Sequence, residues 1–178
     1  MSLRAAPVFW MTGLSGAGKS TLAEIVERRL ESSGRTALVL DGDVMRTIIG
    51  KGLGFSRSDV AENNRRVAEH CSGRRSEADV MIVSTISPYA EGRRVARSLL
   101  DPGFFLIYVA ADLATVMKRD VKGLYQRAVA GEITDMLGYS EDYPYEPPAD
   151  ADIVIASGKE SPEDCAENLY RFMIRHLA

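Results

Sequence analysis

Residues 13–21 read Gly-Leu-Ser-Gly-Ala-Gly-Lys-Ser-Thr and fit the phosphate-binding pattern of glycine, four residues, then glycine, lysine and serine or threonine. Glycines let the backbone wrap closely, so that successive N–H groups point at a phosphate. Lys19 would place a positive charge on the β- and γ-phosphates, and the Ser20 hydroxyl would ligate Mg²⁺. The sequence therefore predicts a site for magnesium and ATP formed by Gly13, Ser15, Gly16, Ala17, Gly18, Lys19, Ser20 and Thr21.

Two carboxylates, Asp41 and Asp43, directly follow an apolar run at residues 36–40. In a parallel sheet the carboxyl ends of the strands form the edge at which α/β folds bind ligands. One carboxylate could hold the hydrated magnesium ion, and the other could accept a proton from an attacking hydroxyl group. An ordinary Asp-Gly turn with a helix-capping aspartate is the alternative.

The elements that must position these groups alternate between short apolar runs and helical segments, which indicates an α/β fold with a parallel sheet. Strands are expected at residues 8–11, 36–40, 80–86, 104–109 and 153–155. Helices are expected over 22–30, 44–49, 91–100, from 113, over 161–176, and from a cap at Ser58 or Asp59 to about residue 77. We predict a single domain over residues 1–178, with a five-stranded parallel sheet flanked by helices in three layers.

Residues 119–148 form the one long polar stretch that could act as a mobile unit. Three prolines near its end, within residues 143–148, exclude regular helix and central strand there. Nucleotide kinases commonly use such an insertion as a lid that excludes water from the phosphates. We therefore expect a lid over about residues 119–148.

Composition excludes several other classes of partner. The net charge of −3 gives no electrostatic reason to expect nucleic acid or an anionic membrane. No apolar stretch approaches the ~20 residues that span a bilayer, and residues 1–7 lack the apolar core of a signal peptide. Cys71 and Cys165 are isolated and fit thiols in a reducing compartment. A cytoplasmic protein without nucleic-acid or membrane partners is expected.

A phosphate-binding loop alone does not distinguish a GTPase switch, a mechanical ATPase and a small-molecule kinase. The Asn-Lys-x-Asp signature of guanine binding is absent, and the chain is short for a mechanical ATPase. The carboxylate pair and the expected lid favour a kinase. A non-catalytic nucleotide-binding module and a kinase for a non-nucleotide small molecule are the alternatives.

Further segments resemble the adenylylsulfate kinase (APS kinase) family of P-loop kinases. Besides the phosphate loop they are Leu-Asp-Gly-Asp-Val-Met-Arg at 40–46, Leu-Gly-Phe-Ser at 53–56, Glu-Asn-Asn-Arg-Arg-Val-Ala-Glu at 62–69, Ile-Ser-Pro-Tyr at 86–89, Asp-Val-Lys-Gly-Leu-Tyr at 120–125, Gly-Glu-Ile at 131–133 and Tyr-Glu-Pro-Pro at 145–148. The resemblance implies transfer of the γ-phosphate of ATP to the 3′-hydroxyl of adenosine 5′-phosphosulfate during sulfate assimilation. The family is commonly dimeric, which implies a homodimer.

The resemblance also implies roles for individual residues. The catalytic residues would be Asp43 as the base, Lys19 and Ser87, with Ser20 and Asp41 holding Mg²⁺ and Arg119 joining the ATP site. The acceptor nucleotide would be bound by Asp43, Arg46, Phe55, Asn63, Arg66, Ile86, Ser87, Lys122 and Leu124. These types suit the task, because a phenylalanine can stack on a purine and an arginine can fork onto an anionic phosphosulfate.

Two positions depart from the family pattern. Val60 and Ala90 stand where the family usually has arginines, the first of which helps to bind the phosphosulfate. A charge-assisted contact contributes ~1.5–3 kcal/mol, so losing one would weaken acceptor binding about ten- to hundredfold. Either Arg57 or Arg66 substitutes, or the acceptor is a different nucleotide such as cytidine diphosphoramidate.

Overall fold

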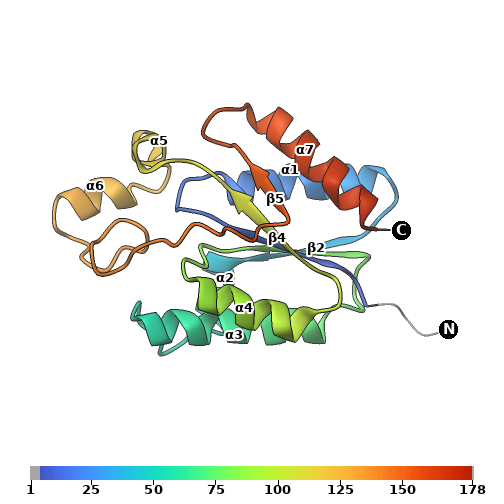
Figure 1. Ribbon diagram of the computed structural model, residues 1–178, viewed down its shortest axis with the longest axis horizontal. Helices are drawn as coiled ribbons and strands as arrows, with labels where there is room; N and C mark the ends of the chain where they lie inside the picture. The colour runs from blue at the N-terminus through green and yellow to red at the C-terminus, as the bar shows by residue number, and fades with distance from the viewer. Residues whose placement is uncertain (1–4, 178) are drawn as a thin grey trace.

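A parallel sheet of five strands forms the middle layer of the computed structural model, which describes residues 5–177 (Figure 1). The strands are β1 (Val8–Thr12), β2 (Ala37–Asp41), β3 (Val80–Ser84), β4 (Phe104–Val109) and β5 (Ile153–Ile155). Their order across the sheet is β2-β3-β1-β4-β5, and every neighbouring pair is parallel. The predicted five-stranded parallel sheet is confirmed, and residues 1–4 and 178 of the predicted domain lie outside the described residues.

Helices cover both faces of the sheet, as Figure 1 shows. On one face lie α1 (Lys19–Ser32) and α7 (Pro162–Arg175), and on the other lie α3 (Arg57–Gly73) and α4 (Ala90–Leu100). Shorter helices follow β2, β4 and the next loop, namely α2 (Gly42–Ile48), α5 (Leu113–Arg119) and α6 (Leu124–Val129). The α5–α6 region lies at the end of the molecule towards which the strands point, opposite the two termini.

The central strand β1 explains why its sequence is apolar throughout. Phe9 and Met11 join the core beneath α1 and α7, whereas Val8 and Trp10 join the core beneath α3 and α4. Successive side chains of a strand point to opposite faces, and both faces of this strand are covered. The phosphate-binding loop therefore begins at the end of a strand that is packed on both faces.

Helix α3 begins earlier than the sequence predicted. The cap is Ser56, whose hydroxyl accepts a hydrogen bond from the backbone N–H of Asp59 at 3.1 Å and donates to the Asp59 carboxylate at 2.7 Å. The predicted cap at Ser58 or Asp59 is wrong, because both residues lie in the first turn of the helix. The helix also ends at Gly73 rather than near residue 77.

Replacing Ser56 with alanine is expected to lower the free energy of unfolding by about 1 kcal/mol, the typical cost of losing a capping hydroxyl. For a chain of this size that lowers Tm by about 2–4 °C. Ser58→Ala removes a neighbouring hydroxyl that caps no helix and should change the free energy by less than about 0.5 kcal/mol. Urea unfolding of both variants checks this, and equal losses would contradict the assignment.

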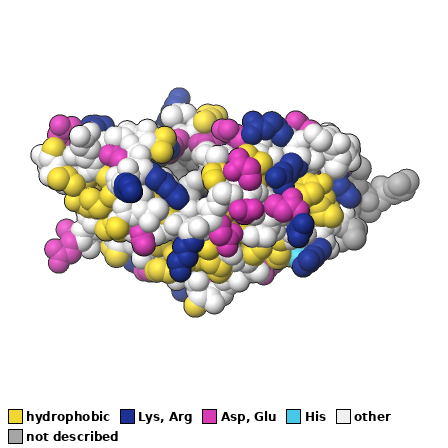
Figure 2. Space-filling view, turned by 90° about the horizontal axis from the view of Figure 1, so that it is seen from above, with side chains coloured by type: hydrophobic (Ala, Val, Ile, Leu, Met, Phe, Trp, Pro, Cys, Tyr) yellow, Lys and Arg dark blue, Asp and Glu magenta, His cyan; other side chains and the backbone are white. Residues whose placement is uncertain are grey.

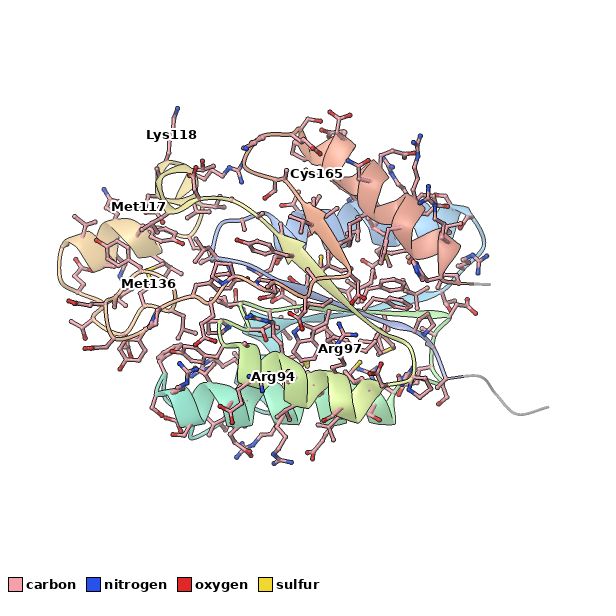
Figure 3. The ribbon with its side chains drawn as sticks, in the orientation of Figure 1. Arg94, Arg97, Met117, Lys118, Met136 and Cys165 are labelled. Atoms are coloured by element: carbon pink, nitrogen blue, oxygen red, sulfur yellow. The ribbon has the colours of Figure 1, made fainter. Side chains whose placement is uncertain are left out.

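The predicted lid region folds against the end of the sheet. It contains α6, and Tyr125 of that helix is buried and donates a hydrogen bond to the carbonyl of Ser15 at 2.9 Å. Met136 and Leu137 in the following loop are also buried. Met136 belongs to the core against which residues of α6 pack, and Figure 3 shows it near that helix. Its movement as a lid stays a prediction.

The surface carries positive and negative side chains side by side on the face shown in Figure 2. Within residues 5–177, no helix combines the length and the apolar character needed to cross a bilayer.

Candidate active site

The phosphate-binding loop connects β1 to α1 and depends on its glycines. A Cβ at Gly13 would lie 2.5 Å from the carbonyl oxygen of Val109, so that only glycine lets the loop pass so close to β4. Gly18 has a left-handed conformation with φ of 99° and precedes the first residue of α1. No side chain caps this helix start. Its N–H groups are therefore free to bind a phosphate.

Lys19 lies folded into the same loop. Its ammonium group donates hydrogen bonds to the carbonyls of Gly13 at 2.8 Å and Leu14 at 2.9 Å. The pKa of Lys19 is lowered to about 7, chiefly by burial and then by the nearby charge of Lys122, while the charges of Asp43 and Asp41 oppose this lowering. The Lys19 ammonium group therefore loses its proton readily unless an anion such as a phosphate binds beside it.

Lys19 should make nucleotide binding depend on pH. At pH 8 the free lysine is mostly neutral, and a bound triphosphate restores its charge, so binding takes up a proton. We expect ATP affinity to fall by up to about tenfold per pH unit as pH rises from 7 to 9.

Lys19 also affects folding stability. A lysine in the unfolded chain titrates at 10.5, so the contribution of Lys19 to the free energy of unfolding rises with pH from about 7 towards 10.5.

Titration calorimetry at pH 8 in buffers of different ionisation enthalpy measures this proton uptake. Lys19→Arg is the matched variant, because arginine stays protonated and should take up no proton. Equal proton uptake by the two proteins would contradict the account.

Asp41 is the helix-capping aspartate that the sequence left open as an alternative, and it also contacts Ser20. One carboxylate oxygen accepts hydrogen bonds from the N–H groups of Asp43 at 2.9 Å and Val44 at 3.4 Å, so Asp41 caps α2. The other oxygen accepts from the Ser20 hydroxyl at 2.8 Å. The side chain therefore joins the end of β2 to the start of α1.

The donor set at this point fits Mg²⁺. Ser20 and Asp41 offer hard oxygen ligands from two elements, which is the kind of ligand Mg²⁺ prefers. No cluster of three or more histidine, cysteine or carboxylate side chains occurs among the described residues. That also suits Mg²⁺, which usually keeps several waters and takes further ligands from substrate phosphates.

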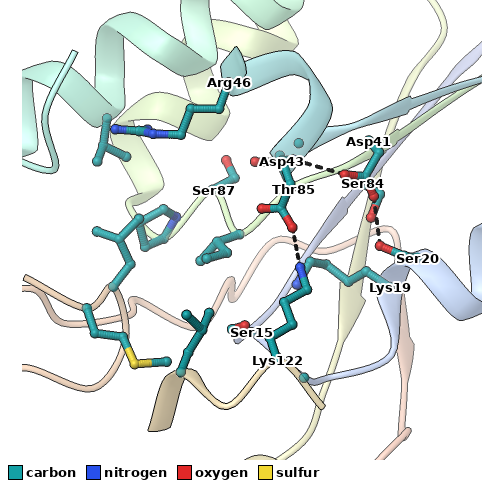
Figure 4. A pocket seen from close by; sticks show the side chains of 18 of the residues that line it. Ser15, Lys19, Ser20, Asp41, Asp43, Arg46, Ser84, Thr85, Ser87 and Lys122 are labelled. Atoms are coloured by element: carbon teal, nitrogen blue, oxygen red, sulfur yellow. Dashed lines mark hydrogen bonds and ion pairs between the residues drawn. The ribbon is translucent and has the colours of Figure 1, made fainter. Parts of the chain in front are cut away.

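Asp43 lies two residues further on, in the first turn of α2, and its side chain is exposed. Lys122, from the loop between α5 and α6, forms an ion pair with it (Figure 4). The pair joins the predicted lid to the predicted base. In this state the carboxylate already has a partner, which an acceptor hydroxyl would have to displace.

A cavity of about 500 Å³ extends from the phosphate loop to the space between α2, α3 and the lid region. The predicted residues that line it are Ser15, Gly16, Gly18, Lys19, Ser20, Thr21, Asp41, Asp43, Arg46, Phe55, Asn63, Ile86, Ser87, Lys122 and Leu124. The fold thus brings the predicted ATP loop, base and acceptor residues around one space.

The aromatic wall of the cavity is held by Arg46. The Arg46 guanidinium lies 4.1 Å from the centre of the Phe55 ring and donates hydrogen bonds to the carbonyls of Leu53 and Gly54. Phe55 keeps 36% of its surface exposed and is not a core residue. Arg46 therefore fixes an exposed aromatic surface at the mouth of the cavity.

Both arginines considered as substitutes for the missing family arginines are engaged elsewhere. Arg66 binds Glu62 at 2.7 Å and the carbonyl of Ile49 at 3.0 Å. Arg57 pairs with Glu146 at 2.7 Å, and its guanidinium lies 4.2 Å from the centre of the Tyr89 ring. Neither residue lines the cavity in this structure.

The two positions at which the sequence departs from the family pattern, Val60 and Ala90, have different surroundings. Val60 is buried and packs with Tyr89 and Leu137, so an apolar contact between α3 and the lid region stands where the family has a charge. Ala90 begins α4, and its backbone N–H donates to the Glu146 carboxylate at 2.7 Å.

The remaining predicted ATP residues, Gly13, Ala17 and Arg119, do not line the cavity. Arg119 donates to the carbonyl of Ser157 at 2.6 Å, and the Ser157 hydroxyl donates to the carbonyl of Ala17 at 2.7 Å. Arg119 is therefore connected to the phosphate loop through Ser157.

Ser87 is held in a strained conformation. Its φ of 42° is unusual for a residue other than glycine and costs about 1–3 kcal/mol. Asn64 donates to its hydroxyl at 3.1 Å, and Thr12 and Arg93 donate to its carbonyl at 3.1 and 2.8 Å. Because the hydroxyl accepts from Asn64, its own proton is free to point into the cavity, which Ser87 lines.

Several lining residues received no role from the sequence. They are Gly42, Val60, Asn64, Ser84, Thr85, Pro88, Val121, Ile133, Asp135, Met136 and Leu137. Asn64 was visible as the neighbour of Asn63, but only the rotation of α3 shows which asparagine reaches Ser87. Ile133 belongs to the Gly-Glu-Ile segment quoted above, but no local pattern marked the loop residues 134–137.

A glycine loop that leads into a helix, with an aspartate pair beside a cavity large enough for a second substrate, is the arrangement of a P-loop kinase. The chain belongs to the adenylylsulphate kinase family, whose model matches residues 5–156. This confirms the family and the fold that the motifs predicted.

Individual relatives agree with this. The chain is 42% identical over 174 residues to an adenylyl-sulfate kinase of Paraburkholderia xenovorans strain LB400, covering 98% of this chain and 96% of that protein. A structure of the Mycobacterium tuberculosis APS kinase CysC with AMPPNP and APS is 36% identical, with a TM-score of 0.89 over 96% of this chain and 98% of that one. A hexameric APS kinase from Thiobacillus denitrificans is 26% identical, with a TM-score of 0.66, over 97% of this chain and 29% of that one.

Proposed function

We propose that this protein is an adenylyl-sulfate kinase that transfers the γ-phosphate of ATP to the 3′-hydroxyl of adenosine 5′-phosphosulfate. The observation that carries the proposal is the cavity that the phosphate loop, Asp43, Phe55 and Asn63 line together. Membership of the family and the M. tuberculosis structure with AMPPNP and APS support it.

The donor side rests on the loop and its lysine. The N–H groups at the start of α1 bind the phosphates, and Lys19 leaves the carbonyls of Gly13 and Leu14 to reach the β- and γ-phosphates. Ser20 and Asp41 hold Mg²⁺, which when bound neutralises charge on the phosphates. Arg119 supports the donor nucleotide.

On the acceptor side Asp43 acts as the general base. Its carboxylate takes the proton of the 3′-hydroxyl as the new oxygen–phosphorus bond forms and the bond to ADP breaks. Lys122 must first release this carboxylate, after which its ammonium group can stay beside the transferred phosphoryl group. One residue of the lid region thereby couples acceptor binding to lid position.

The acceptor nucleotide is held by the walls of the cavity. Its base stacks on Phe55, which Arg46 keeps in place. Asn63 and the Ser87 hydroxyl offer polar contacts, while Ile86 and Leu124 pack against the ligand. Closure of residues 119–148 excludes water, so that the phosphoryl group reaches the nucleotide rather than solvent.

The setting of the reaction is part of the proposal. Both cysteines of the described residues are free and buried, which suits a reducing compartment such as the cytoplasm. A homodimer is the proposed assembly. Sulfate assimilation is the proposed pathway.

A coupled ADP-release assay tests the proposal. Adenosine 5′-phosphosulfate with Mg²⁺ and ATP should give steady turnover, well above the rate without acceptor. Cytidine diphosphoramidate and plain nucleotides are the comparison arms, because Arg46 is the sole arginine of the described residues that lines the cavity. Faster turnover with one of them would assign a different acceptor, and no ADP release with any nucleotide would favour a non-catalytic module.

A further inference from the structure

One carboxylate in the cavity has no partner. Asp135 lines the same space as Phe55 and Asn63 and is half-buried. Asp41 is bound by Ser20, and Asp43 is bound by Lys122. Within residues 5–177, the Asp135 carboxylate takes part in no hydrogen bond or ion pair, although it faces a ligand space.

Several apolar side chains lie beside Asp135 in the same loop. Its neighbours Met136 and Leu137 are buried, and Met136 and Ile133 also line the cavity. The backbone N–H of Met136 donates to the Ser140 hydroxyl at 3.2 Å, which closes a turn over this loop. Hydrogen bonds made in such low-polarity surroundings are stronger than those made in water.

Asp135 also lines the same cavity as Arg46 and Phe55. Burial lowers the pKa of Arg46, and the charge of Asp135 is among those that oppose this lowering. The same guanidinium lies 4.1 Å from the centre of the Phe55 ring. The carboxylate therefore shares the cavity with the ring on which, under the proposed function, the acceptor base stacks.

The chemistry of a carboxylate limits what can lie beside it in the cavity. An ionised carboxylate accepts hydrogen bonds and donates none. An exocyclic amino group, as on adenine or cytosine, supplies the donor that it needs. A keto oxygen at the same place, as in hypoxanthine or uracil, would leave two acceptors facing each other, which weakens binding relative to the amino-bearing base.

We propose that Asp135 is a specificity-determining residue that selects acceptor nucleotides whose base carries an exocyclic amino group. The proposal rests on the proposed function, because it assumes that the acceptor base stacks on Phe55. It is compatible with adenine and cytosine acceptors alike, and it excludes their keto counterparts.

Binding and turnover of matched adenine and hypoxanthine nucleotides test this. In the full chain with ADP present, calorimetry should show that AMP binds at least tenfold more tightly than IMP. In the ADP-release assay, kcat/KM should favour adenosine 5′-phosphosulfate over inosine 5′-phosphosulfate to a similar extent. Asp135→Ala should bring both ratios close to one, and Asp135→Asn, whose amide can donate to a keto oxygen, should improve the hypoxanthine ligands.

Thr134→Ala is the matched control, since this exposed neighbour in the same loop does not line the cavity. It should keep the wild-type ratios. Equal ratios in wild type and Asp135→Ala, or an equal loss of affinity for both bases, would overturn the proposal. If the protein bound AMP more tightly than IMP but showed no turnover, that result would instead contradict the kinase assignment. Failure of the Asp135 proposal and failure of the proposed function can therefore be distinguished.

Discussion

Replacing Asp43 with asparagine is expected to lower kcat by at least about 10²-fold, the usual size of a general-base contribution, while ATP still binds. The carboxylate lies in the first turn of α2 at the cavity, where an acceptor hydroxyl can reach it. Asparagine keeps the shape of the side chain but cannot take a proton. Steady-state kinetics measures the loss of kcat, and calorimetry on the same preparation measures whether ATP still binds.

Lys122 provides the control for this experiment. Asp43→Asn also leaves the Lys122 ammonium without its partner, so part of the effect could come from a displaced lysine. Lys122→Met and the double variant form a cycle that separates the two contributions. If Asp43 is the base, the double variant should stay as slow as Asp43→Asn, and near-normal turnover in either would remove Asp43 from that role.

Lys19→Ala is expected to lower kcat/KM by about 10²-fold or more with every acceptor, because the positive charge on the transferred phosphate is lost. Lys19 is also buried and binds the carbonyls of Gly13 and Leu14. Its removal therefore changes the loop as well as the charge. Thermal unfolding of the variant must be measured beside the kinetics to separate the two effects.

Lys118→Ala is the matched control for this charge. Figure 3 shows the Lys118 side chain pointing away from the fold, at the end of α5. Its loss should leave kcat/KM within about twofold of wild type, as is usual for exposed positions outside a site. Comparable losses for Lys118 and Lys19 would indicate a general electrostatic effect rather than a contact with phosphate.

Local patterns predicted the framework of the molecule well. The apolar runs at β4 and β5 coincide with the observed strands, and the glycine loop follows β1 as expected. Such patterns are readable because backbone geometry and burial act on neighbouring residues. The start of α3 was missed since two hydroxyl residues and an aspartate at 56–59 compete as caps, and only the observed hydrogen bonds identify Ser56.

The sequence could not predict which way individual side chains point, and this limited the prediction of the site. Arg57 and Arg66 were reasonable candidates to replace a missing charge, yet Glu146 and Glu62 bind them outside the cavity. Val60 packs on Leu137, a contact across the chain that no local spacing reveals. Asp135 lies in a polar segment without periodicity, so its place in the cavity depends on how that segment folds over the sheet.

The central claim is phosphoryl transfer from ATP to the 3′-hydroxyl of the acceptor nucleotide. Phosphorus NMR of the product formed from adenosine 5′-phosphosulfate, ATP and Mg²⁺ tests it most directly, because coupling to the ribose proton identifies the phosphorylated carbon. The account predicts one new phosphate ester on the 3′ oxygen, formed together with ADP in equal amount. A phosphate on another position, or ADP accompanied only by inorganic phosphate, would contradict it.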